Sequence, residues 1–259
     1  MLIAAALFFA LQSCQNQGQS VNNPSNNATN NTAAATNALS FVKKEFKADK
    51  EGQTASYSID IAQGDSPQAQ FINNSIFRSL QGTEANISKN NLNYQELANS
   101  FVTDAIAYQK EDPSGDWSSD NTAVVYYNSP NFISVVTSGW EYAGGAHGNP
   151  WANALYLDPA KLQMLMIKDI IGDEMALRKL ISPLLDKELK KTGEYDASYL
   201  EIFADNGLVR LPACVYFSST EAFFDFSHQE LFDAGMSNAI STLVKIPIAQ
   251  VQPFLKLKL

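Results

Sequence analysis

The sequence has very little of the residues on which most metal and nucleophile chemistry depends. Only 2 of its 259 residues are histidine and only 2 are cysteine. The patterns His-Glu-x-x-His, Cys-x-x-Cys and Gly-x-Ser-x-Gly, which are typical of zinc proteases, metal or redox sites and serine hydrolases, do not occur. The sequence therefore predicts no metal site and no cofactor, and Cys14 and Cys214 do not make a disulfide framework.

The chain is also short of charge, and of basic charge above all. Charged residues make up 17% of the sequence, with 18 Lys and Arg against 27 Asp and Glu, which gives a net charge of −9. Nucleic acid is therefore not an expected partner, because phosphate binding needs clustered Lys and Arg. A basic protein is a better electrostatic match. Hydrophobic residues make up 45%, which is typical of a globular chain with an ample core.

A short apolar run, residues 2–11, lies close to the N-terminus. About ten residues are too few to span a bilayer as a helix, but they are typical of the hydrophobic part of a signal peptide. The run ends in Leu11-Gln12-Ser13-Cys14, which resembles the lipobox of bacterial lipoproteins. The resemblance implies cleavage before Cys14 and lipidation of that residue. Residues 1–13 are thus predicted to be a lipoprotein signal peptide, with a plain secretory signal as the alternative.

Residues 14–40 are predicted to be a flexible tether. From residue 15 to residue 40 there is no charge, and Asn, Gln, Thr, Ser and Ala dominate. Such a segment cannot bury enough apolar surface to fold, and as a coil it would have an end-to-end distance of roughly 25–30 Å. Gln15, not aspartate, follows Cys14. We therefore expect a lipid anchor in the bacterial cell envelope, in the outer membrane facing the periplasm or on the cell surface.

The rest of the chain is predicted to be α+β. Strands are expected at residues 41–48, 54–62, 122–127, 132–140, 151–157, 162–167, 215–217, 223–226 and 242–248. Glu51-Gly52 is the predicted turn between the first two. Helices are expected to begin at Pro67 and Val251 and to cover residues 93–109 and 174–191, the last with a kink or break near Ser182 because Pro183 follows. This order favours two sub-domains of antiparallel sheet with packed helices, which we assign to residues 41–150 and 151–259.

The stretch Tyr142-Ala-Gly-Gly-Ala-His-Gly148 is the candidate binding site. Its three glycines permit positive φ angles and a close neighbour, and His147 has an ordinary pKa near neutrality. The candidate binding residues are Tyr142, Gly144, Gly145, His147, Gly148 and Trp151.

This stretch, with Asn153 and Tyr156 in the strand that follows, resembles an extracytoplasmic paired domain of unknown function. That domain occurs in the lysozyme-sensing anti-sigma factor RsiV and in the non-catalytic part of the peptidoglycan deacetylase PdaC. The segment Val244-Lys-Ile-Pro247 resembles the end of the same domain, whereas His228-Gln-Glu-Leu231 departs from it. The resemblance implies an envelope location, an α/β fold in two sub-domains and, in one branch, binding of lysozyme.

Several candidate residues allow a chemical or a structural interpretation. His147 could hydrogen-bond backbone at a tight corner, contact a ligand, act as a base beside a carboxylate, or bind metal with His228. Cys214, in an apolar run, is predicted to be a buried small hydrophobe. The remaining candidates are Asp225, Glu230 and Asp233, predicted to be solvated charges, and Trp140, Tyr142, Trp151 and Tyr156, which could stack on sugars or belong to the strand core.

The sequence favours a lipid-anchored envelope binding protein without an activity of its own. Basic, lysozyme-like muramidases and peptidoglycan are the candidate partners, and the membrane is reached through the N-terminal lipid. An envelope hydrolase that uses His147 with a nearby carboxylate is the alternative.

Overall fold

A computed structural model describes residues 38–81, 93–111, 115–144, 148–191, 204–205, 207–227 and 241–259. The predicted signal peptide, the lipidation site Cys14 and nearly all of the predicted tether lie outside these residues. In the part of the chain that the structure describes, no helix is long and apolar enough to cross a membrane.

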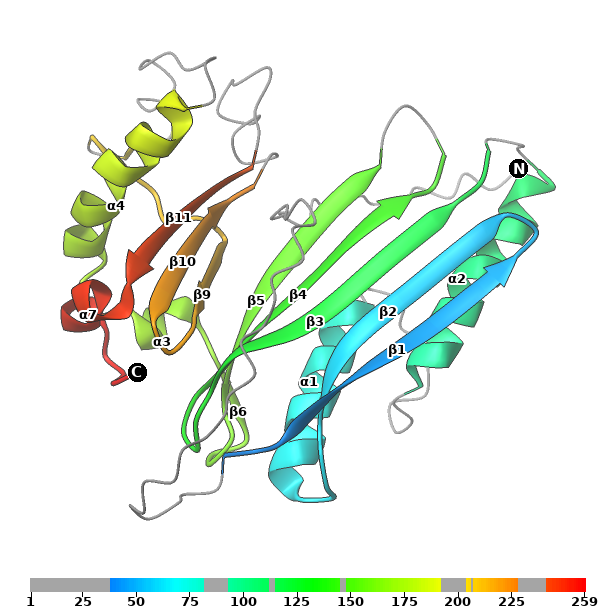
Figure 1. The fold of residues 1–259 in the computed structure, drawn as a ribbon, viewed down its shortest axis with the longest axis horizontal. Helices are drawn as coiled ribbons and strands as arrows, with labels where there is room; N and C mark the ends of the chain where they lie inside the picture. Colours follow the sequence, from blue (N-terminus) through cyan, green and yellow to red (C-terminus); the bar gives the residue numbers. More distant parts are fainter. Residues whose placement is uncertain are drawn as a thin grey trace, which may run out of the picture.

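A six-stranded sheet forms the larger part of the protein, with the spatial order β1-β2-β3-β4-β5-β6 (Figure 1). Its strands are β1 (Phe41–Lys50), β2 (Gln53–Ala62), β3 (Ser118–Asn128), β4 (Ile133–Tyr142), β5 (Asn149–Asp158) and β6 (Gln163–Leu165). The β1–β2 turn is the predicted Glu51-Gly52 pair, with φ of 53° and 82°. Positive φ at both residues is typical of the tight turn that joins twisted antiparallel strands, so this prediction is confirmed.

Two helices, α1 (Pro67–Gln81) and α2 (Tyr94–Gln109), cover one face of this sheet (Figure 1). The Ser66 hydroxyl accepts the Ala69 N–H at 3.1 Å, and the Asn93 side chain accepts the Glu96 N–H at 3.1 Å. Both helices begin as predicted, because these caps satisfy donors that the first turn leaves free. The helices also carry the chain across the sheet, so β2 and β3 run parallel, where the sequence predicted only antiparallel pairing.

A second, three-stranded sheet has the order β11-β10-β9. Its strands are β9 (Cys214–Phe217), β10 (Glu221–Phe226) and β11 (Thr242–Pro247), and with it pack α3 (Ile167–Ile170), α4 (Glu174–Lys190), α7 (Ile248–Val251) and the 3-10 turn η1 (Gln252–Phe254). A two-stranded pair, β7 (Ala204–Asp205) and β8 (Leu208–Val209), lies against α4. The fold is thus α+β with two sheets, as predicted.

The sequence predicted a kink or a break near Ser182, and helix α4 continues through Pro183 without a break. Proline removes the N–H that the carbonyl four residues earlier would accept. That carbonyl belongs to Lys179, which is exposed, so water can replace the lost bond. In the same turn the Ser182 hydroxyl donates to the Arg178 carbonyl at 2.7 Å and accepts the Val209 N–H at 3.0 Å, which fixes β8 to the helix.

The change from one sheet to the other comes later in the chain than the sequence suggested. Residue 150 lies inside β5, which pairs with β4 from Ile133↔Leu157 to Glu141↔Asn149. Because β4 and β5 are hydrogen-bonded neighbours, the large sheet continues across this position to β6 at Leu165. The elements of the small sheet follow from α3 onward.

The small sheet packs against the face of the large sheet that α1 and α2 leave uncovered. Strand β9 lies against β4 and β5, and Cys214, Tyr216 and Phe223 pack on Ala152 and Tyr126. This contact covers only part of the face. The strand ends around Trp140 extend beyond it, and that remaining part carries the candidate site.

Candidate functional site

The glycine-rich stretch lies between β4 and β5 at one end of the large sheet. Tyr142 ends β4, Gly144 has a φ of 82°, and Gly148 immediately precedes β5. The candidates Gly145 and His147 lie outside the described residues, as do His228, Glu230 and Asp233. The predicted hydrolase chemistry therefore stays a prediction.

Trp140 and Tyr142 form a stacked aromatic pair at this end of β4. Their ring centroids are 6.2 Å apart and their planes differ by 13°. Residues two apart on a strand point to the same face, which explains why the rings lie side by side. Trp140 is 38% exposed, a large fraction for an indole, and Tyr142 is half-buried. The pair is thus available at the surface rather than part of the core.

Gly148 lies in close contact with the Trp140 ring of this pair. A Cβ added to Gly148 would lie 2.3 Å from Cε2 and Cζ2 of the Trp140 ring. Any side chain at position 148 would therefore displace the indole, which rests directly on the glycine backbone. The absence of a side chain at this glycine of the predicted motif thus allows Trp140 to lie close to the neighbouring strand.

Trp151 belongs to the opposite face of the sheet, so it is separated from Trp140. It is half-buried on the side covered by the helices, and it lies beside Gly139, where an added Cβ would be 2.6 Å from the indole nitrogen. Tyr156 is buried, and its hydroxyl donates to the Val215 carbonyl of β9. The four aromatic candidates therefore divide: Trp140 and Tyr142 are surface residues, whereas Trp151 and Tyr156 stabilise the fold.

Asp120 completes the site and was missed by the sequence analysis. It stands opposite Trp140 in the β3–β4 register and is exposed, and its carboxylate accepts the Ser56 hydroxyl at 2.6 Å. One step along the same face, the hydroxyls of Thr122 and Ser138 are 2.8 Å apart. The sequence offered no alternation here, because residues 118–122 are all polar, and β3 therefore begins four residues before the predicted start at Thr122. We call Trp140, Tyr142 and Asp120 the aromatic face.

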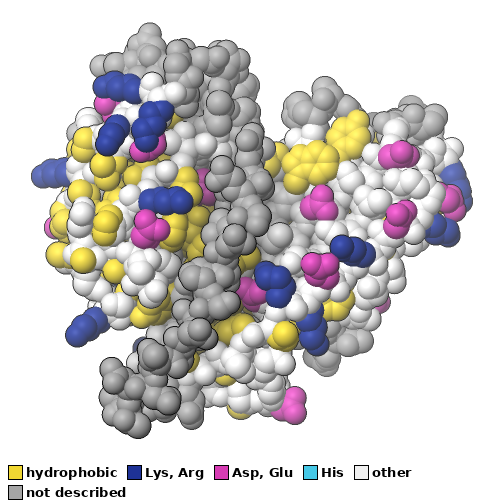
Figure 2. All heavy atoms as spheres, in the orientation of Figure 1, with side chains coloured by type: hydrophobic (Ala, Val, Ile, Leu, Met, Phe, Trp, Pro, Cys, Tyr) yellow, Lys and Arg dark blue, Asp and Glu magenta, His cyan; other side chains and the backbone are white. Residues whose placement is uncertain are grey.

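The lysines near this face are already paired with acids. Lys43 lies 3.1 Å from Asp60, and Lys47 lies 3.2 Å from Glu45. Among the described residues, Asp120 has no such basic partner within ion-pair distance. Figure 2 shows hydrophobic, acidic and basic side chains on the large-sheet half of this view. At the aromatic face itself, the exposed Trp140 ring lies beside the carboxylate of Asp120.

A second group of polar side chains is buried between the two sheets. Asp225 was predicted to be a solvated charge, and this is wrong, because it is only 5% exposed. It lies on β10, the central strand of the small sheet, where it pairs with Cys214 of β9 on one side and Leu243 of β11 on the other. Burial raises the pKa of the neighbouring Tyr126 and Tyr216 hydroxyls above the usual value, and the carboxylate of Asp225 raises both further. Cys214 is fully buried beside them, as predicted for a small hydrophobe.

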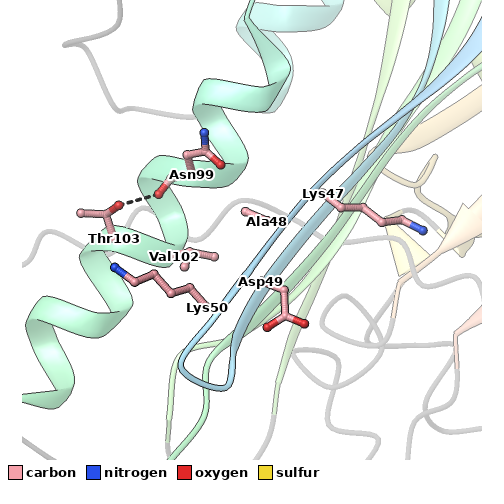
Figure 3. A pocket seen from close by; sticks show the side chains of 7 residues that line it. All are labelled: Lys47, Ala48, Asp49, Lys50, Asn99, Val102 and Thr103. Carbon is pink, nitrogen blue, oxygen red and sulfur yellow. Dashed lines mark hydrogen bonds between the residues drawn. The ribbon is translucent and has the colours of Figure 1, made fainter.

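An open cavity of about 370 Å³ lies elsewhere, between the edge strand β1 and helix α2 (Figure 3). In Figure 3, Lys47 and Asp49 point away from the helix, whereas Lys50 extends toward Thr103. The Thr103 hydroxyl donates a hydrogen bond to the Asn99 backbone carbonyl at 2.7 Å. This cavity shares no residue with the aromatic face, and the described residues contain no cluster of three or more His, Cys, Asp or Glu side chains able to hold a metal ion.

The fold and site define an α+β protein in which a helix-backed sheet exposes one aromatic end. Two solved structures have a similar fold. One is a DUF3298 family protein from Pseudomonas aeruginosa PAO1, with a TM-score of 0.50, 16% identity, and coverage of 84% of this chain and 94% of that chain. The other is a member of the DUF3298 family from Bacteroides fragilis NCTC 9343, with a TM-score of 0.52, 17% identity, and coverage of 85% and 94%.

At this level of identity the likeness shows the fold alone. It agrees with the resemblance to a paired domain of unknown function, while the link to RsiV and PdaC stays a prediction. No family model and no curated protein matches the sequence.

Proposed function

We propose that the protein is a lipid-anchored binding protein of the bacterial cell envelope, without catalytic activity of its own. Its partner binds at the aromatic face. The observation that carries this proposal is the near-parallel pair of Trp140 and Tyr142, at the surface of a strand and beside the exposed carboxylate of Asp120.

Tryptophan and tyrosine are the side chains that contribute most to binding at protein surfaces. They cover a large area while losing little conformational entropy, and they are enriched among the residues that dominate an interface. On this protein the pair is held by a neighbouring strand and by Gly148 rather than by a mobile tip. The rings are therefore positioned before the partner arrives, which lowers the cost of binding.

A basic, lysozyme-like muramidase is the partner that the charge favours. The whole chain carries a net charge of −9, and the lysines nearest the site are neutralised by Asp60 and Glu45. An Arg or Lys of the partner could pair with Asp120 and lie over the Trp140 ring, because cations are attracted to aromatic faces. The sequence resemblance to the domain found in the lysozyme-sensing anti-sigma factor supports the same choice.

Isothermal titration with a c-type lysozyme tests this proposal. Trp140→Ala should weaken binding by about tenfold or more, and Asp120→Asn should both weaken binding and flatten its dependence on salt. Tyr108→Ala is the matched control, because Tyr108 is 46% exposed on α2 and lies outside the aromatic face. No heat with the unmodified protein, or an equal loss in Tyr108→Ala, would contradict the muramidase proposal.

Peptidoglycan is a second candidate, favoured by the geometry of the rings. Two aromatic planes within 13° of each other can stack on successive apolar faces of a saccharide chain, with hydroxyls such as Thr122 and Ser138 nearby to hydrogen-bond its polar edges. Soluble glycan fragments in the same calorimeter distinguish the two candidates. Glycan binding should depend on Trp140 but only weakly on salt, because its main contacts are not between opposite charges.

A further inference from the structure

We propose that a second surface, at the opposite end of the large sheet, rests on the membrane. It consists of Leu162, Met164 and Met166, which we call the apolar corner. This inference rests on the proposed lipid anchor, since the tether brings this surface to the bilayer.

The three side chains of the apolar corner are large and hydrophobic, yet they are exposed to solvent. Leu162 is 44% exposed, Met164 52% and Met166 59%. The three residues alternate along the chain through and beside the short edge strand β6. Their inward neighbour Leu165 packs on the core instead. Three large apolar side chains side by side at the rim of a sheet mark a surface that meets another apolar phase.

Leu162 holds a backbone conformation that its side chain disfavours. Its φ is 52°, in the left-handed region, at the last position of the four-residue loop between Asp158 and Gln163. Glycine or asparagine would adopt this conformation with less strain, and for a bulky residue it is uncommon. The turn itself does not require leucine here, so the feature to be explained is the leucine side chain. Here the side chain is aliphatic and directed into solvent.

The chain enters the structure at this same end. The Leu39 carbonyl accepts a hydrogen bond from the Asn128 side chain at 2.7 Å, so the first described residues are fixed to the end of β3. Asn128 lies opposite Ile133, Ile133 opposite Leu157, and Leu157 opposite Met164. Asn128 and Met164 thus share one cross-strand row, three strand spacings or roughly 15 Å apart. Figure 1 shows the start of β1 and β6 at one end of the sheet.

The charge around the apolar corner also suits a membrane. Exposed lysines flank it at Lys161, Lys168 and Lys256, although the chain as a whole is acidic. The ammonium of Lys256 donates to the backbone carbonyl of Lys168 at 2.6 Å, which holds this positive charge beside the start of α3. Lys161 is paired with Asp158 at 2.9 Å, and the exposed acids nearby in the chain are Asp169, Asp173 and Glu174. Aliphatic side chains with flanking lysines match the interface of a bilayer that contains anionic lipid.

A tethered surface needs little affinity of its own. The predicted tether would hold the protein within tens of ångströms of the bilayer, so a contact that is weak in free solution becomes populated. Contact at the apolar corner would fix the orientation of the protein. The aromatic face, at the other end of the strands, would then point away from the membrane toward its partner.

Vesicle co-sedimentation of the chain from residue 14 onward, with Cys14→Ser to remove the lipid, tests the contact directly when the vesicle lipid is at roughly millimolar concentration, which replaces the local concentration that the tether would supply. The probe is a vesicle of phosphatidylethanolamine and phosphatidylglycerol. The combined variant Leu162→Asn, Met164→Gln, Met166→Gln should bind about tenfold less, while its melting temperature should not fall, because Asn relieves the strain at position 162. Met175→Gln is the control, since Met175 is 45% exposed at the start of α4.

Equal vesicle binding by the combined variant and the unmodified protein would overturn the proposal, as would an equal loss in Met175→Gln. A dimer in sedimentation velocity that the combined variant dissociates would also overturn it, by showing that a second copy covers the corner. The titration with lysozyme or glycan should be unchanged in the combined variant. Failure of the membrane contact is therefore distinguishable from failure of the binding function.

Discussion

The Ser134 hydroxyl of the large sheet accepts the backbone N–H of Phe217 in the small sheet, at 3.2 Å. Both residues are fully buried. Strand β9 pairs with β10 on one side only, so its other edge would leave backbone groups without partners. Ser134 satisfies the N–H of Phe217, and the Tyr156 hydroxyl satisfies the carbonyl of Val215. Two side chains of one sheet thus complete the edge of the other and fasten the two sheets together.

This relationship predicts that Ser134→Ala destabilises the protein strongly, although the substitution is small. The substitution removes one oxygen but leaves a buried N–H unsatisfied, so the free energy of unfolding should fall by about 1–3 kcal/mol. Chemical denaturation measures the change. Ser219→Ala, in the exposed turn between β9 and β10, is the control and should have almost no effect. Equal stability of the two variants would contradict the role given to Ser134.

Gly148→Ala should destabilise the protein through Trp140. The new methyl group would lie 2.3 Å from the ring, so the indole must move, at a cost of about 1–3 kcal/mol. In a Trp140→Ala background the ring is absent, and the same substitution should cost much less. A double-mutant cycle by denaturation, together with tryptophan fluorescence, checks this coupling. An equal cost in both backgrounds would show that position 148 needs glycine for another reason.

Tyr94→Phe should stabilise the protein. The Tyr94 ring packs on Phe46, Tyr57 and Phe77, but its buried hydroxyl has no hydrogen-bond partner among the described residues. Removing an unsatisfied buried hydroxyl should raise the free energy of unfolding by about 1 kcal/mol.

Tyr156→Phe makes the same chemical change and should have the opposite sign, because it deprives the Val215 carbonyl of its donor. Thermal denaturation of both variants in one buffer provides the measurement. If both substitutions shift the melting temperature in the same direction, the two hydroxyls do not differ as the structure indicates.

Stability should fall in alkaline solution because of Tyr216. Burial holds the pKa of this hydroxyl, and of its hydrogen-bonded neighbour Tyr126, above the ordinary value of 10.0. Above about pH 10 the unfolded chain therefore releases protons that the folded protein retains, and unfolding becomes more favourable as the pH rises. Below that pH the contribution is fully present. The slope of unfolding free energy against pH should be shallower in Tyr216→Phe than in the unmodified protein.

The faces of the strands show where sequence reasoning reached its limit. The sequence analysis grouped Trp140 with Trp151, but the register of β4 with β5 places Trp151 opposite Gly139, so the two indoles lie on opposite faces. Alternation does not say which face receives α1 and α2 and which stays open. That choice depends on contacts between residues far apart in the chain, such as the bond of 2.7 Å between the hydroxyls of Ser79 and Thr137.

An irregularity in β3 shows the same limit more sharply. The register of β3 with β4 shifts between Val125 and Tyr127, and strict alternation would place Tyr126 and Tyr127 on opposite faces. Instead Tyr126 packs on Tyr216, and Tyr127 packs on Phe132, so both contact the side of the small sheet. The Asp60 carboxylate accepts the Val125 N–H at 3.0 Å beside this shift. The local sequence does not predict this bulge, because Asp60, which binds the backbone beside it, lies 65 residues from Val125 in the chain.

The sequence by itself determined the local features: the Glu51-Gly52 turn, the helix starts at Ser66 and Asn93, and the two-sheet α+β class. The turn and the two helix starts depend on residues within a few positions of one another, and the α+β class was inferred from the order of such elements along the chain. Only the tertiary structure decided that β2 and β3 run parallel, that Asp225 is buried, and that Asp120 lies beside Trp140. These facts depend on which distant segments pack together, because burial and register are properties of the whole molecule.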